Sequence, residues 1–147
     1  MASPLPAVAA VAVVLVAVVM VAGAGGAGGR GRQPDRRTVT VHLTAHYSRF
    51  SPATVDVRPG TTVTFVIRNL DPIDHEFIIG GPEVHARHEV GREAHHHGEV
   101  PGEISVPAGT TASTTWTAPA GMGTVVFACH LPGHFAYGMA GVVRVSA

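Results

Sequence analysis

Short runs of β-branched residues, each closed by a turn that contains glycine or proline, make up most of the chain from residue 38 onward. Residues 38–47 alternate strictly between apolar and polar side chains, which indicates a strand with one face in a core. The other runs are residues 54–57, 61–69, 75–79, 104–106, 110–117, 124–129 and 141–145. These seven or eight strands predict an all-β domain, an antiparallel sandwich, over residues 38–147.

Composition limits the partners that such a domain can have. The chain has 147 residues and no evident internal repeat, which predicts a single domain. Ten arginines balance ten acids and there is no lysine, so no basic face for a nucleic-acid partner is expected. The charges are unevenly placed, because residues 71–103 hold eight acids and six histidines against two arginines. That segment is suited to a cation.

The only cysteine, Cys129, stands at the end of one predicted strand. His134 follows five positions later, and Met139 five positions after that. Thiolate, imidazole and thioether groups suit copper, and blue-copper sites combine two histidines and one cysteine with a distant methionine. The loop therefore predicts a copper site that needs one more histidine. His75, which begins a strand after the turn at residues 71–72, is the natural candidate.

Alternatives to this ligand set remain open at this level. An unpaired thiol in an exported chain can form an intermolecular disulfide, and the cysteine, histidine and methionine can be ordinary core and surface residues. Met122 is a rival axial ligand, although it lies in a turn-forming segment. Zinc accepts one cysteine and two histidines but disfavours a thioether, so copper is preferred. His130, beside the cysteine, is expected to be exposed to solvent or to contact the ligands without binding metal.

The spacing of Cys129, His134 and Met139, with His75 upstream, resembles the cupredoxin family of plastocyanin-, azurin- and rusticyanin-type proteins, and is most similar to rusticyanin. The resemblance covers residues 38–147 and includes the turns at residues 50–52 and 59–61. It implies a Greek-key β-sandwich with one type 1 copper ion at its rim, cycling between Cu⁺ and Cu²⁺. The chain departs from the family at Glu76, where a small polar residue such as asparagine is common. The Glu76 carboxylate is expected to lie beside the ligands, to lower the potential, or to replace the methionine as a ligand.

Residues 81–103 interrupt the strand pattern and indicate an inserted loop with a short helix over residues 82–91. On such a helix His85, His88 and Glu89 would share one face. The insertion is a candidate secondary copper site, and its histidines are His85, His88, His95, His96 and His97. A mobile, solvated loop without a specific site is the alternative interpretation. The insertion resembles those of periplasmic copper-tolerance cupredoxins.

Residues 1–24 are expected to be a signal peptide or an N-terminal membrane anchor. Residues 7–24 form an unbroken apolar run near the lower limit for a spanning helix, and residues 22–24 offer a small-x-small cleavage site. Residues 25–37 are a flexible linker of glycine and arginine, whose four arginines oppose export by the positive-inside rule. We favour export, to the periplasm or the outer face of the cell membrane, because a copper–thiolate domain belongs outside the reducing cytosol.

Three functions fit these residues. We favour a type 1 copper electron carrier, in which an apolar collar around His134 meets a redox partner; the collar is Leu131, Pro132, Phe135, Ala136 and Tyr137. The alternative is a copper-tolerance or copper-delivery protein that uses the insertion for extra copper and exchanges it with a donor or acceptor. A copper oxidoreductase is disfavoured. Such enzymes connect the type 1 copper to a second copper through a histidine beside the cysteine, and here His130 is present but the other ligands of a second copper are not expected in one small domain. We therefore expect a monomeric domain that is not an enzyme.

Overall fold

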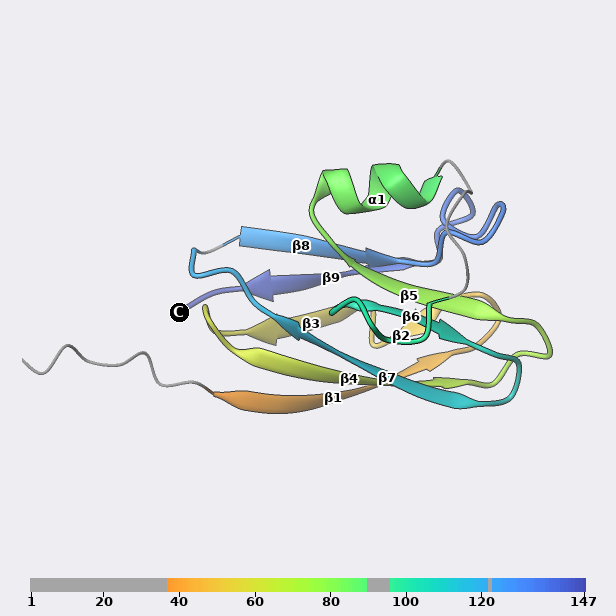
Figure 1. Cartoon of the computed structure of the whole chain (residues 1–147), viewed down its shortest axis with the longest axis horizontal. Helices are drawn as coiled ribbons and strands as arrows, with labels where there is room; N and C mark the ends of the chain where they lie inside the picture. Colours follow the sequence, from red (N-terminus) through yellow and green to blue (C-terminus); the bar gives the residue numbers. More distant parts are fainter. Residues whose placement is uncertain (1–36, 90–95, 122) are drawn as a thin grey trace, which may run out of the picture. The chain divides into compact units, whose positions relative to one another are not determined.

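The computed structural model describes residues 37–89, 96–121 and 123–147 (Figure 1). The described residues belong to one compact unit, Arg32–Ala147. The predicted leader or anchor, the linker before Arg37, His95 and Met122 lie outside the described residues. Within the described part of the chain, no helix has the length and apolar character needed to cross a membrane.

The domain is a Greek-key β-sandwich of two sheets: the strand pattern predicted the sandwich, and the family resemblance implied the Greek-key topology. One sheet has the order β2-β1-β4-β7 and the other β3-β9-β8-β5-β6. Their bounds are β1 Thr38–Ala45, β2 Phe50–Ser51, β3 Thr54–Val57, β4 Thr62–Asn69, β5 His75–Gly80, β6 Glu103–Val106, β7 Thr111–Thr117, β8 Gly123–Ala128 and β9 Ala140–Val145. The two-residue strand β2 is the element that the sequence pattern missed, because so short a run carries no alternation.

The sheets are mixed, so the prediction of a purely antiparallel sandwich was wrong. β1 pairs with β4 in parallel, and β3 pairs with β9 in parallel, while the other pairs are antiparallel. The physical reason lies in the connections. After β1 and β2 the chain crosses to the other sheet for β3, and it returns for β4, which then runs beside β1 in the same direction. Local alternation reports a strand's faces but not the direction of its neighbour.

Aromatic residues between the sheets fix the two strands that carry the predicted ligands. Phe77 of β5 and Phe127 of β8 are fully buried, and their ring centroids lie 5.2 Å apart. Because side chains alternate along a strand, His75 shares the face of Phe77, and Cys129, just beyond β8, continues the face of Phe127. β5 and β8 are antiparallel neighbours. The core therefore delivers the histidine and the thiol to the same end of the sandwich.

The predicted short helix is present as α1, Pro82–Glu89, and it packs over β5 and β8 (Figure 1). Its first residue is proline, which suits the first turn because that position needs no N–H donor. His85 and His88 are its buried residues. The His85 Nε2 atom lies 3.2 Å from the Val126 carbonyl oxygen on β8. The insertion therefore begins as an ordered helix that turns two histidines inward, which is not what a solvated loop would do.

Candidate metal centre

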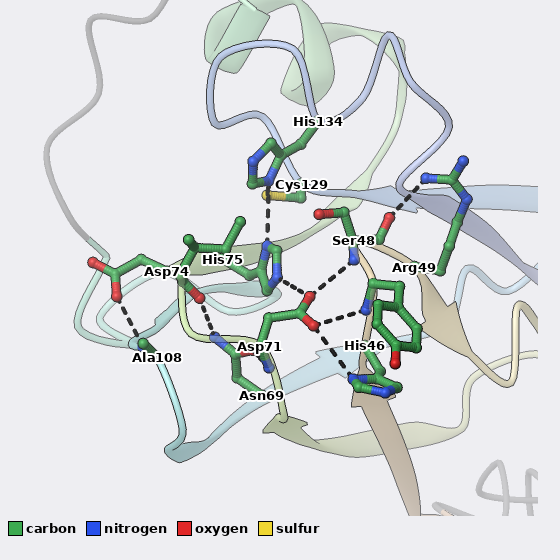
Figure 2. A network of polar contacts seen from close by, with 12 residues as sticks. His46, Ser48, Arg49, Asn69, Asp71, Asp74, His75, Ala108, Cys129 and His134 are labelled. Atoms are coloured by element: carbon green, nitrogen blue, oxygen red, sulfur yellow. Dashed lines mark hydrogen bonds and ion pairs between the residues drawn. The ribbon is translucent and has the colours of Figure 1, made fainter.

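His75, Cys129 and His134 converge at one end of the sandwich (Figure 2). The Nδ1 atoms of His75 and His134 are 3.2 Å apart, and Cys129 Sγ is 3.2 Å from His134 Nδ1. One potential ligand atom from each residue lies within 4.8 Å of the other two. Two nitrogens and one sulfur at such separations can share a single ion. The structure thus brings together three of the four residues that the sequence selected as ligands.

Backbone turns fold the loop between β8 and β9 back on itself. Gly133 and Gly138 have φ values of 86° and 87°, in the left-handed region that glycine adopts without strain. The amide of His134 donates to the carbonyl of Leu131, and that of Met139 to the carbonyl of His134, both at 2.9 Å. The amide of Cys129 donates to the carbonyl of Met139 at 3.1 Å. The cysteine, the histidine and the methionine are therefore joined by backbone hydrogen bonds.

A buried carboxylate orients the His75 ring. His75 Nε2 lies 2.8 Å from Asp71 Oδ2, so this nitrogen donates and Nδ1 keeps its lone pair for the centre of the cluster. Asp71 itself accepts hydrogen bonds from the amides of Tyr47 and Ser48 at 2.7 and 2.8 Å (Figure 2). Its amide donates to the Asn69 side chain at 2.9 Å. The ring is thereby held in the tautomer that metal binding requires.

The balance of effects on Asp71 keeps it ionised. Burial of the carboxyl group raises its pKa, but the hydrogen bonds from Ser48, His75 and Tyr47 outweigh burial and lower the pKa to about 2. A permanent negative charge next to His75 strengthens that imidazole as a donor to a cation.

Cys129 is fully buried and, in the absence of metal, is a thiol. Burial raises the pKa of the Cys129 thiol to about 11, although the amide of Glu76 donates to the sulfur at 3.3 Å and acts in the opposite direction. His134 is partly exposed, and burial together with the neighbouring His75 lowers its pKa, so its ring is neutral at pH 7. A metal ion must therefore displace the thiol proton, whereas His134 is ready to bind.

Met139, Glu76 and His130, the other residues predicted at or beside the centre, lie in different surroundings. Met139 is fully buried. The Glu76 carboxylate is not part of the ligand cluster found among the described residues, and it lines a cavity of about 400 Å³ with His75, His96 and His97. His130 is half-buried rather than solvent-exposed, and its Nε2 lies 2.8 Å from His85 Nδ1. Burial, and then the nearby His85 and His88, lower the pKa of His130 to about 4.

A second cluster joins the insertion to β6. His88, His96 and Glu103 have potential ligand atoms within 4.8 Å of one another. Of the other insertion histidines, His85 contacts His130 instead, and His97 is exposed. Sequence reasoning missed Glu103, because a buried carboxylate at the start of a strand is indistinguishable in sequence from a loop acid. It paired the helix with Glu89, which is exposed.

The surface beside His134 is apolar. Tyr137 is 79% exposed, Pro132 and Ala136 are exposed, and Leu131 and Phe135 are half-buried. His134 is partly exposed and belongs to the same loop as these side chains, so the apolar collar around it stays a prediction.

The fold and the ligand geometry define a copper-binding cupredoxin. Residues 38–146 match the model of the copper-binding proteins of the plastocyanin/azurin family, and the chain belongs to that family. The chain is 39% identical over 113 residues to the copper-resistant cuproprotein CopI of Rubrivivax gelatinosus, covering 75% of this chain and 67% of that protein. It is 28% identical to the copper-resistant cuproprotein CopI of Pseudomonas aeruginosa, covering 74% and 76%. The structure of dithionite-reduced auracyanin from Roseiflexus castenholzii superimposes with a TM-score of 0.62 at 25% identity, covering 76% of this chain and 99% of auracyanin.

Proposed function

We propose that this protein holds one type 1 copper ion and exchanges single electrons through it. The observation that carries the proposal is the convergence of three atoms: His134 Nδ1 lies 3.2 Å from His75 Nδ1 and 3.2 Å from Cys129 Sγ. This set of one sulfur and two nitrogens, with buried Met139 as the axial ligand, suits copper better than zinc. Copper bound there would supply a one-electron couple.

The protein's own residues support rapid exchange of the electron. Asp71 and the turns around Gly133 and Gly138 fix the ligands before metal arrives, so little rearrangement accompanies a change in charge. The exposed apolar surface around His134 offers a redox partner a small transient docking area close to a ligand. We assign a carrier role rather than an enzyme, acting as a monomeric domain exported from the cytosol. The donor or acceptor of its electrons is a protein.

Copper tolerance is the second candidate function, and it is compatible with the first. It is favoured by the two relatives whose names are copper-resistant cuproproteins, and by the acidic, histidine-rich insertion. In this role the protein would lower the burden of free copper outside the cytosol and pass copper to a protein acceptor.

Spectroscopy of the copper-loaded full chain tests the type 1 assignment. The expected result is an intense visible copper–thiolate band with narrow copper hyperfine splitting in the electron paramagnetic resonance spectrum. A Cys129→Ser protein should lack both signals. If it keeps the visible band and the narrow hyperfine splitting, Cys129 is not a copper ligand and the type 1 assignment is wrong. Deleting residues 82–99 then separates the two functions. A carrier keeps its redox kinetics after the deletion, whereas a tolerance protein loses copper stoichiometry above one and the protection of cells against copper.

A further inference from the structure

We propose that His88, His96 and Glu103 form a second metal site, which takes a divalent ion of the Cu²⁺ or Zn²⁺ class. The site is distinct from the cysteine centre: its residues come from α1, the segment before β6, and β6 itself. The geometry stands on its own, and only the choice of copper over zinc in the cell rests on the copper-tolerance function proposed above.

The distances match those of ligands around one ion. Glu103 Oε2 lies 3.4 Å from His88 Nε2 and 3.4 Å from His96 Nδ1. Nitrogen and oxygen ligands bind zinc at about 2.0–2.1 Å, and two such ligands at a tetrahedral angle are about 3.4 Å apart. The two imidazole rings have centroids 5.0 Å apart and an interplanar angle of 48°. No side chain needs to move far to close this set on a cation.

The hydrogen bonding of His88 leaves its Nε2 atom without a donor. Its Nδ1 lies 2.7 Å from the Val84 carbonyl oxygen, which can only accept, so Nδ1 carries a proton. In the neutral ring, Nε2 then presents a lone pair, and what it faces is the Glu103 carboxylate, another acceptor. Nε2 of His88 is buried and has no hydrogen-bond partner. His96 faces the same carboxylate oxygen through Nδ1. Two buried acceptors facing each other repel unless a cation lies between them.

The chain positions the three ligands by other contacts. The amide of His96 donates to Ser105 Oγ at 2.9 Å, and the Ser105 amide donates to the His96 carbonyl at 2.9 Å, which ties this histidine to β6. Arg87 donates to the second carboxylate oxygen of Glu103 at 3.1 Å, so Oε2 alone faces the imidazoles. The side chains of His88, Glu103 and His96 are 2%, 6% and 9% exposed. A buried cluster whose outer contacts are already made resembles a metal site more than a surface ion pair.

The donor set selects the class of ion. Two imidazoles and a carboxylate suit Cu²⁺ and Zn²⁺, whereas Cu⁺ prefers thiolate and thioether ligands, and Mg²⁺ or Ca²⁺ prefer oxygen alone. Copper(II) binds such ligands more tightly than zinc does, so it would occupy the site wherever copper is in excess. The competing explanation is that protonated histidines pair with Glu103 and no metal binds.

Metal stoichiometry of the full chain distinguishes these explanations. After loading with Cu²⁺ and dialysis, His88→Gln and Glu103→Gln should each lose one equivalent of copper relative to the unmodified chain. Both should keep the visible copper–thiolate band, which shows that they are folded. His97→Gln is the matched control, because His97 is the exposed neighbour of His96, and it should lose nothing.

A second arm removes the cysteine centre. The Cys129→Ser protein should still bind Zn²⁺ or Cu²⁺ at the second site, and adding Glu103→Gln should weaken that binding by about tenfold or more. Unchanged stoichiometry in both His88→Gln and Glu103→Gln would overturn the proposal, and an ion pair without metal would then be the explanation. If instead the thiolate band is absent from the unmodified chain while the Glu103-dependent equivalent remains, the type 1 proposal fails and the second site stands.

Discussion

The imidazole Nε2 of His75 lies 2.8 Å from the Oδ2 atom of Asp71, four residues earlier in the chain. Both oxygens of that carboxylate also accept amide protons from the turn after β1, at Tyr47 and Ser48. A single buried group therefore links the connection between β1 and β2 to a candidate ligand on β5. The same contact both orients the imidazole and holds two segments of the fold together.

Replacing Asp71 with asparagine should weaken copper binding and stability together. Whichever carboxylate oxygen becomes an amide nitrogen, a donor then faces a backbone N–H donor. We expect copper affinity to fall by about 10–100-fold, the usual effect of losing the group that orients a histidine ligand. Competition with a copper chelator measures this loss. Asp74→Asn is the matched control: it removes the same charge from the same turn, but Asp74 is exposed and contacts Ala108 instead. Equal losses in the two variants would show that net charge, not orientation, is responsible.

Stability of the metal-free protein should fall in acid because of the same residue. The pKa of Asp71 is about 2 in the folded protein, below the value of 3.8 expected for an aspartate in the unfolded chain. A depressed pKa stabilises the fold at pH values above the unfolded pKa, and this contribution is lost as the pH falls from about 4 through about 2. The contribution amounts to about 2 kcal/mol. Urea unfolding at pH 6 and at stepwise lower pH should show this slope, and Asp71→Asn should show a shallower one.

The sequence was sufficient for the sandwich and for the three side chains that converge in the candidate centre, for an identifiable reason. A strand can be predicted from its own residues, because apolar and polar side chains alternate along it. Val63, Phe65 and Ile67, for example, are all fully buried. The candidate ligands Cys129 and His134 are five residues apart on one loop. Few kinds of site combine a thiol and an imidazole at this spacing, so few interpretations remain. The parallel pairing of β1 with β4 was not predictable, since it depends on the route of the chain between sheets.

Sequence reasoning failed where function depends on contacts between distant segments. Asp71 accepts from Tyr47 and Ser48, and neither spacing nor composition connects those residues. Glu103 meets His88 and His96 only because β6 pairs beside β5 while α1 packs over β5. The acidic, histidine-rich composition of residues 71–103 did signal a cation-binding segment, but not which three side chains meet.

Gly141→Ala should destabilise the domain without touching a ligand. A Cβ atom at this position would stand 2.3 Å from Phe127 Cζ and 2.6 Å from the Ala53 carbonyl oxygen. Phe127 is fully buried in the aromatic core, so it has little room to retreat. We expect a loss of about 1–3 kcal/mol in the free energy of unfolding, the usual cost of overpacking. Urea unfolding measures it. Gly121→Ala is the control, since a Cβ there would have no atom within 4 Å, and a comparable loss in that variant would refute the steric explanation.

Met139 offers a test of axial ligation that leaves the core filled. Met139→Leu retains an apolar side chain of similar size at a fully buried position, so its cost in stability should stay below about 1.5 kcal/mol. The axial ligand tunes the reduction potential, because losing a fourth donor costs Cu²⁺ more than Cu⁺, for which three ligands are sufficient. Its removal should therefore raise the reduction potential, and Met139→Gln, which offers a harder oxygen donor, should lower it. Voltammetry of the two variants checks both directions. Identical potentials for both and for the unmodified protein would remove Met139 from the ligand set.

Copper binding should release the thiol proton of Cys129, and affinity should depend on pH accordingly. Burial raises the pKa of this thiol to about 11, so in the metal-free protein it is protonated at neutral pH. His134 is neutral there, because its pKa is lowered, and adds no proton to the exchange. The apparent affinity of the cysteine centre should then rise by about tenfold per pH unit between about pH 7 and 9. Chelator competition across this range measures the slope, and titration in weak buffer measures the proton released. In Cys129→Ser the slope should vanish along with the tight binding. An affinity independent of pH in the unmodified protein would mean that the sulfur is already a thiolate before copper arrives, and that burial does not control its ionisation.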